Sequence, residues 1–171
     1  MNKLVVLFGL LITMFSVSCQ TKSSNQSSLT TKPMSTSVNK TNEEWKKELT
    51  PEQYSVLREK GTERPYTGEY NLHFEKGVYK CAGCGTELFN DSQKFESHCG
   101  WPSFDGEIGV GDKIKKIKDS SHGMVRTEIV CAKCGGHLGH IFDDGPTKTG
   151  QRYCVNSLSL DFTPADSNKT K

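Results

Sequence analysis

The sequence predicts a mainly β domain, an antiparallel sandwich or barrel with short helices at its N-terminal end. From Tyr66 onward, short runs of β-favouring residues alternate with glycine-containing turns, a pattern typical of antiparallel β proteins. Two helix-start signals precede this region, and two Cys-x-x-Cys-Gly motifs lie within it. The predicted strands are 77–80, 87–89, 125–130, 136–142 and 152–162.

Length and composition set the limits of the prediction. The 171 residues suffice for one domain with a core, but a hydrophobic content of 33% is low for a fully folded chain. Part of the chain is therefore expected to lie outside the core. A net charge of +2 provides no strong basic field, so nucleic acid is not an expected partner. Nothing indicates an extended apolar interface, and we expect a monomer.

The N-terminus has the pattern of a bacterial export signal. A basic start at Lys3 leads into an apolar run over residues 4–17, which is too short for a comfortable membrane span. Ser18 and Cys19 follow, as at a lipoprotein cleavage site. We therefore predict a signal peptide over 1–18 and a lipid on Cys19, which would anchor an exported protein facing the periplasm or the cell exterior. An ordinary signal peptide and an uncleaved anchor are the alternatives.

The residues after the signal are strongly polar. Residues 19–42 are rich in Ser, Thr, Asn, Gln and Lys, and they cannot bury enough apolar surface to offset the entropy of ordering. We predict a disordered tether there, a folded domain over 43–164 and a disordered tail over 165–171.

The folded domain is expected to begin with two short helices. Thr41 and Glu44 have the spacing of a capping box, in which each side chain bonds the backbone of the other. Thr50 and Gln53 repeat that spacing around a proline, and Gly61 should end the second helix. We expect these helices to cover a sheet.

The paired cysteine motifs predict a metal centre. Cys81 and Cys84 form one knuckle, Cys131 and Cys134 form the other, and four sulfur ligands are the set that a structural zinc ion prefers. A site with four protein ligands has no open position, so we assign it to folding. Disulfides, a single iron as in rubredoxin-like knuckles, and redox dithiols are the alternatives.

Setting aside the lipidation site and the four knuckle cysteines leaves Cys99 and Cys154 as a candidate redox pair. On a strand, Arg152, Cys154 and Asn156 would share one face. A cation beside a thiol favours the reactive thiolate, and an amide can bond a substrate oxygen. The alternatives are a buried structural cysteine at 154 and a loop in which Trp101 only plugs the core.

Two histidines stand three residues apart on a predicted strand. His137 and His140 would face opposite sides of a regular strand, but Gly139 between them could admit a β-bulge that turns both to one side. One of them as a core histidine is the ordinary alternative. A second metal site formed with Cys154 is another.

Taken together, these motifs resemble the B-type methionine sulfoxide reductases. The resemblance runs from about Glu48 to Phe162 and is carried by the segments 49–54, 61–65, 99–104, 137–142 and 152–157 and by both cysteine knuckles. It implies a rolled β-sandwich of two antiparallel sheets, with one structural zinc ion far from the active site.

The resemblance also implies roles for the residues around Cys154. Cys154 would be the nucleophile that attacks the sulfoxide sulfur, and Arg152 would favour its thiolate form. His137, His140 and Asn156 would donate protons or hydrogen bonds to the sulfoxide oxygen, directly or through water.

The remaining implied roles concern the substrate and turnover. Trp101 and Phe142 would form an apolar wall for the substrate methyl group. Cys154 would become a sulfenic acid, and Cys99 would condense with it to a disulfide. A thioredoxin-like dithiol would reduce that disulfide. The substrates would be oxidised proteins that carry methionine-R-sulfoxide and, more weakly, the free amino acid.

Two other classes of protein compete with this interpretation. A zinc-ribbon binding module would explain the knuckles but leaves Cys99, Cys154 and the histidines without a role. A rubredoxin-like electron carrier would use the same four cysteines for iron.

Overall fold

The computed structural model describes residues 37–165. The predicted signal peptide, Cys19 and most of the predicted tether and tail lie outside these residues. Within 37–165, no helix is long and apolar enough to cross a membrane.

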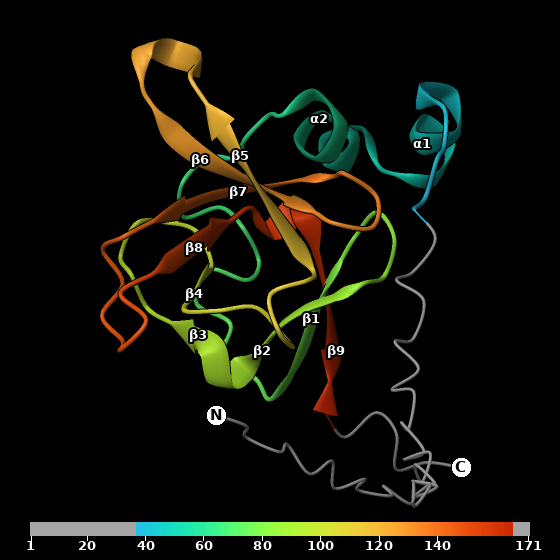
Figure 1. Ribbon diagram of the computed structural model, residues 1–171. Helices are drawn as coiled ribbons and strands as arrows, with labels where there is room; N and C mark the ends of the chain where they lie inside the picture. Colours follow the sequence, from blue (N-terminus) through green and yellow to red (C-terminus); the bar gives the residue numbers. More distant parts are fainter. Residues whose placement is uncertain (1–36, 166–171) are drawn as a thin grey trace, which may run out of the picture. The chain divides into compact units, whose positions relative to one another are not determined.

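The described residues form two antiparallel sheets (Figure 1), which confirms the mainly β class. The smaller sheet has the order β2-β1-β9 and the larger has the order β3-β4-β8-β7-β6-β5. The strands are β1 (Gly77–Cys81), β2 (Glu87–Asn90), β3 (Lys94–Phe95), β4 (Ser103–Phe104), β5 (Ile114–Asp119), β6 (Arg126–Cys131), β7 (His137–Phe142), β8 (Arg152–Val155) and β9 (Leu160–Pro164). The helices are α1 (Asn42–Glu48) and α2 (Pro51–Glu59).

The predicted strand over 152–162 is wrong as a single element. It is two strands in different sheets, β8 and β9, separated by a short 3-10 turn over Ser157–Ser159. The sequence pattern also does not predict β5. That strand lies at the edge of the larger sheet and exposes four successive residues, three of them lysines, so it has the charged surface that protects a sheet edge.

Aromatic side chains from both sheets fill the core. Tyr79 of β1 and Phe89 of β2 are fully buried and contact Phe104 of β4 in the other sheet. The rings of Phe89 and Phe104 stack with their centroids 4.2 Å apart, and Tyr153 of β8 meets Phe89 at 5.9 Å. This packing holds β8, which contains Cys154, and β4, which follows the loop with Cys99.

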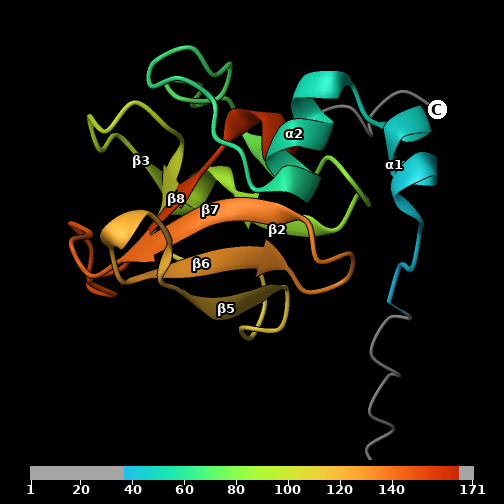
Figure 2. The same ribbon diagram turned by 90° about the horizontal axis from the view of Figure 1, so that it is seen from above.

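Both predicted helix starts are confirmed. The Thr41 side chain accepts the backbone N–H of Glu44, the Thr50 side chain accepts that of Gln53, and both capping boxes are complete. Helix α2 ends at Glu59, with Lys60 in the left-handed conformation. Figure 2 shows α2 lying against β7, and the two elements are in contact.

Candidate active site and metal centre

Four cysteines from the two sheets converge on one point. Cys81 ends β1, Cys131 ends β6, and Cys84 and Cys134 follow in the adjoining turns. The four sulfur atoms lie within 4.8 Å of one another, with Cys81–Cys134 and Cys84–Cys131 each 3.6 Å apart. Zn–S bonds of about 2.3 Å in a tetrahedron place sulfurs about 3.8 Å apart. The donor set therefore fits zinc with little adjustment.

The two helices brace this cluster. A Cβ atom added to Gly83 would lie 3.6 Å from the Trp45 ring, so α1 packs directly on the first knuckle. Arg58 of α2 donates to the carbonyl oxygen of Cys134 at 3.1 Å, and its guanidinium lies 5.1 Å from the centroid of the Trp45 ring. The cluster therefore joins both sheets and both helices, as expected for a structural site.

The four thiols share their protons. Hydrogen bonds among them raise the pKa of Cys81 and Cys134 and lower the pKa of Cys84 and Cys131. Metal binding requires all four as thiolates, and a divalent cation supplies the charge that replaces their protons.

The other two cysteines of the described residues, Cys99 and Cys154, lie close together. The sulfur of Cys154 on β8 lies 3.7 Å from that of Cys99, which stands in the loop before β4. Strand β4 pairs with β8 and places Ser103 opposite Cys154, which brings the loop beside the strand. A disulfide has an S–S length of about 2.05 Å, so the sulfurs need to approach by less than about 2 Å to form one.

A hydrogen bond between Cys99 and Cys154 shifts the pKa of both thiols. A hydrogen bond from Cys154 lowers the pKa of Cys99 to about 4, and the hydroxyls of Ser97 and Ser103 act in the same direction. The same hydrogen bond, together with burial, raises the pKa of Cys154, and Arg152 opposes that rise. The hydrogen bond between the two sulfurs therefore favours the thiolate form of one partner and the thiol form of the other.

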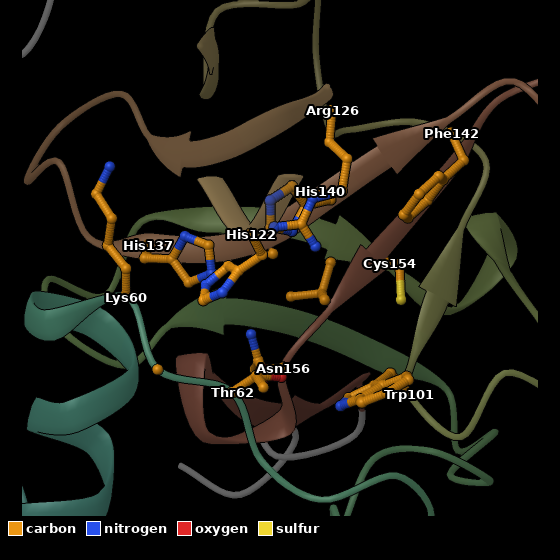
Figure 3. A pocket seen from close by; sticks show the side chains of 13 residues that line it. Lys60, Thr62, Trp101, His122, Arg126, His137, His140, Phe142, Cys154 and Asn156 are labelled. Carbon is orange, nitrogen blue, oxygen red and sulfur yellow. The ribbon is translucent and has the colours of Figure 1, made fainter. Parts of the chain in front are cut away.

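A cavity of about 260 Å³ opens beside Cys154 (Figure 3). Trp101 and Phe142, the predicted apolar wall, both line it. Neither Cys99 nor Arg152 lines it, and neither does any cysteine of the metal centre. The lining residues are Lys60, Gly61, Thr62, Trp101, His122, Arg126, His137, Gly139, His140, Phe142, Cys154, Val155 and Asn156.

The predicted β-bulge brings the two histidines together. The register between β6 and β7 shifts between Ile129 and Val130, and the rings of His137 and His140 lie 5.7 Å apart on the cavity. Gly139 has a φ of 153°, and a Cβ atom there would lie 2.0 Å from the carbonyl oxygen of Cys154. Only glycine therefore allows this close approach of β7 to β8.

Each histidine is held by a carboxylate. Nδ1 of His137 lies 2.8 Å from Glu128, and Nε2 of His140 lies 2.8 Å from Asp119. An ionised carboxylate only accepts hydrogen bonds, so these nitrogens carry the protons and the other nitrogen of each ring is left for other partners. Glu128 is 3% exposed and also accepts from Lys60 at 2.7 Å.

Asn156 is largely occupied by the protein itself. Its Oδ1 accepts from the Thr62 hydroxyl at 2.9 Å and from the backbone N–H of Glu63 at 3.2 Å. Its Nδ2 donates to the carbonyl oxygen of Leu138 at 3.1 Å. One amide hydrogen remains for a substrate, and the other contacts fix where that hydrogen points.

Arg152 acts on the cysteine pair from outside the cavity. Its guanidinium forms two 2.8 Å hydrogen bonds with Asp144 and lies 4.5 Å from the centroid of the Phe142 ring. It therefore holds Phe142, and its positive charge and hydrogen bonding lower the pKa of Cys154.

Several residues of the cavity are not predicted by the sequence patterns. Lys60, Thr62, His122 and Arg126 line the cavity from segments without an assigned role, and Glu128 lies behind it. Thr62 belongs to the segment 61–65 that carries the resemblance, and that was the available signal. Strand and turn patterns do not indicate that Lys60, His122 and Arg126 line a cavity.

Comparison with known proteins agrees with this geometry. A model described as the SelR domain matches residues 49–164. The chain belongs to this family. A relative from Leptospira interrogans is 59% identical over 129 residues, covering 75% of this chain and 98% of its own length. Relatives from Methanosarcina barkeri (56%; 77% and 92% covered) and Chromohalobacter salexigens (53%; 78% and 100% covered) match similarly. All three are named peptide methionine sulfoxide reductase MsrB.

Proposed function

We propose that the protein reduces methionine-R-sulfoxide, chiefly within oxidised proteins, to methionine. One observation carries this proposal: two thiols lie 3.7 Å apart, and one of them lines a cavity that also presents two histidines and two aromatic rings. Such a site offers a nucleophile, proton donors, an apolar wall and a second thiol together.

Cys154 is the proposed nucleophile because it lines the cavity and Cys99 does not. The reaction requires Cys154 as a thiolate, with the shared proton on Cys99. Arg152 favours that form of the pair, because its positive charge lowers the pKa of Cys154. The Cys154 thiolate then attacks the sulfoxide sulfur.

Breaking the S–O bond requires protons at the oxygen. His137 and His140 face the cavity from β7, and Asn156 offers one amide hydrogen beside them. Trp101 and Phe142 receive the substrate methyl group. The bond between the two sulfurs then breaks with its electron pair on the methionine sulfur. The protonated oxygen passes from that sulfur to Cys154, so methionine leaves and Cys154 is left as a sulfenic acid.

Cys99 then resolves the sulfenic acid. Its sulfur attacks that of Cys154, a disulfide forms, and the oxygen leaves as water. A thioredoxin-like dithiol restores both thiols by exchange. An anchor at Cys19 would place this repair activity at a membrane outside the cytoplasm, with a reductant that works there.

Zinc is the proposed occupant of the four-cysteine site. It supplies folding stability there, because its four ligands come from both sheets and leave no coordination position open. Iron is the alternative, and a colourless protein that contains zinc would exclude it.

The proposed activity predicts discrimination between sulfoxide epimers. With a small dithiol as reductant, we expect turnover of a peptide containing methionine-R-sulfoxide and at least about a hundredfold lower kcat/KM for the S epimer, since the wrong epimer exchanges the positions of oxygen and methyl group. Chiral chromatography of the products measures both rates. A metal-loaded protein with no activity on the R epimer would remove the proposal.

The carboxylate behind His137 predicts a shift in the pH profile. Burial lowers the pKa of His137, Glu128 opposes that lowering, and Lys60 and His140 add to it. If protonated His137 donates to the oxygen, Glu128→Gln should move the alkaline limb of the single-turnover rate to lower pH by about one unit. Lys60→Met should move it to higher pH.

The opposite signs make this test specific. A general disturbance of the cavity would slow both variants without separating their pH limbs. Lys80→Met is the control, because Lys80 pairs with Glu87 at 3.7 Å in the smaller sheet. Limbs of Glu128→Gln and Lys60→Met that coincide with those of the unmodified protein would exclude His137 as the titrating donor.

A further inference from the structure

The segment that follows α2 contacts the chain next to Cys154 and also the chain next to Cys99. This segment, residues 62–66, is here called the strap. It runs from the cavity, where Figure 3 shows Thr62 beside Asn156, to the loop that carries Cys99. No cysteine lies within it. Its first residues hold Asn156, but the contacts between its far end and the Cys99 loop have no part in the proposed reduction of the sulfoxide.

One end of the strap is fixed to the chain just after Cys154. The Glu63 side chain accepts the backbone N–H groups of Ser157 at 2.7 Å and of Leu158 at 3.0 Å. Glu63 is only 8% exposed, and its own N–H donates to Asn156. Bonds to a buried ionised carboxylate are among the stronger ones in proteins.

The other end of the strap brackets Cys99. The backbone N–H of Tyr66 donates to the carbonyl oxygen of Gly100 at 2.8 Å, and the Tyr66 hydroxyl donates to that of His98 at 2.6 Å. These are the two neighbours of Cys99 in the chain. The indole N–H of Trp101 adds a third bond, to the carbonyl oxygen of Glu63 at 3.3 Å.

The backbone at this contact adopts conformations that are uncommon for side-chain-bearing residues. Tyr66 has a φ of 66° and His98 a φ of 55°. Gly100 has a φ of 95°, and a Cβ atom there would lie 2.7 Å from Pro65. The strap and the loop therefore fit closely, although Tyr66 as a whole residue is 67% exposed. Its hydroxyl bond is thus the contact that fixes an otherwise exposed side chain.

We infer that the strap sets the separation of Cys99 and Cys154, and that Tyr66 is a positioning residue for the formation of their disulfide. This inference rests on the proposed function for its biological meaning. In the step concerned, Cys99 sulfur supplies the electron pair of the new S–S bond, the S–O bond of the Cys154 sulfenic acid breaks, and oxygen leaves as water. The strap acts by holding the attacking sulfur in place.

Tyr66→Phe removes only the hydroxyl bond to His98. We expect the rate constant for the Cys99–Cys154 disulfide to fall about three- to tenfold, the usual effect of one hydrogen bond. Methionine formation in a single turnover should stay within about twofold, because the cavity residues are unchanged. Rapid quenching with an alkylating agent, followed by mass spectrometry, measures both steps.

A redox titration tests the inference without any sulfoxide. In glutathione buffers, Tyr66→Phe should make the Cys99–Cys154 disulfide about three- to tenfold easier to reduce, because the reduced pair is no longer held together. Tyr54→Phe is the control, since its ring packs on Lys46 of α1 at 5.2 Å and it lies on α2. It should change neither value.

The outcomes separate the two hypotheses. An unmodified protein that forms no methionine would refute the proposed function, while the titration would still report on the strap. An unchanged disulfide equilibrium in Tyr66→Phe would overturn the role of Tyr66. Equal slowing of methionine formation and disulfide formation would overturn it as well, because the hydroxyl would then act on the cavity.

Discussion

Removing the metal from the four-cysteine site is expected to lower the midpoint of thermal unfolding by at least about 20 °C. Apparent binding energies of structural zinc are about 10–16 kcal/mol, as large as the whole stability of a typical domain, about 5–15 kcal/mol. Here the ligands come from β1 and β6, in different sheets, and both helices pack on the knuckles. Losing the metal therefore loosens every layer of the fold.

Calorimetry of protein treated with a strong chelator measures this effect, and Cys131→Ser should reproduce it. The matched control is Cys99→Ser, the same substitution outside the cluster, for which we expect a shift of less than about 4 °C. An unchanged melting temperature in metal-free protein would mean that the four cysteines do not hold a structural ion.

Cys154→Ser is expected to lose sulfoxide reduction by about a thousandfold or more. A serine hydroxyl has no anionic form near neutral pH and is a far weaker nucleophile toward sulfur than a thiolate. The substitution is nearly isosteric on a half-buried strand position, so the fold should be retained. Single-turnover assays with excess protein measure the loss, with the melting temperature as a check on folding.

Cys99→Ser should behave differently, and the comparison assigns the two roles. It should form one methionine per chain and then stop when a thioredoxin-like protein is the only reductant, since no disulfide can form. Sustained turnover of this variant with such a reductant would show that Cys99 does not resolve the intermediate.

Local patterns predicted the parts of the fold that local chemistry decides. The capping boxes at Thr41 and Thr50, the two cysteine knuckles and the bulge at Gly139 all follow from residue type and spacing. The strand over 152–162 was wrong because the break at Ser157 depends on Glu63, almost a hundred residues earlier, which accepts the N–H groups of Ser157 and Leu158. A tertiary contact of that kind leaves no mark in a periodic pattern.

The residues of the cavity also differ in how far the sequence predicts them. Cysteine accounting and the family resemblance pointed to Cys99, Cys154 and the histidines. Neither indicated Glu128, because a carboxylate in a strand is ordinarily a surface residue and its burial depends on Lys60 and His137. The sequence did not indicate Tyr66 for a similar reason. Its proposed positioning role depends on its contact with the loop that carries Cys99, which only the folded structure shows.

Under the proposed function, reduction at Cys154 ends in a disulfide bond to Cys99. The most direct test supplies reduced protein with one equivalent of methionine-R-sulfoxide and no reductant, then alkylates free thiols and maps the peptides. We expect one methionine per chain, a cross-linked pair of peptides containing Cys99 and Cys154, and four remaining thiols at the metal centre. Methionine formed while Cys99 and Cys154 both remain open to alkylation would contradict it.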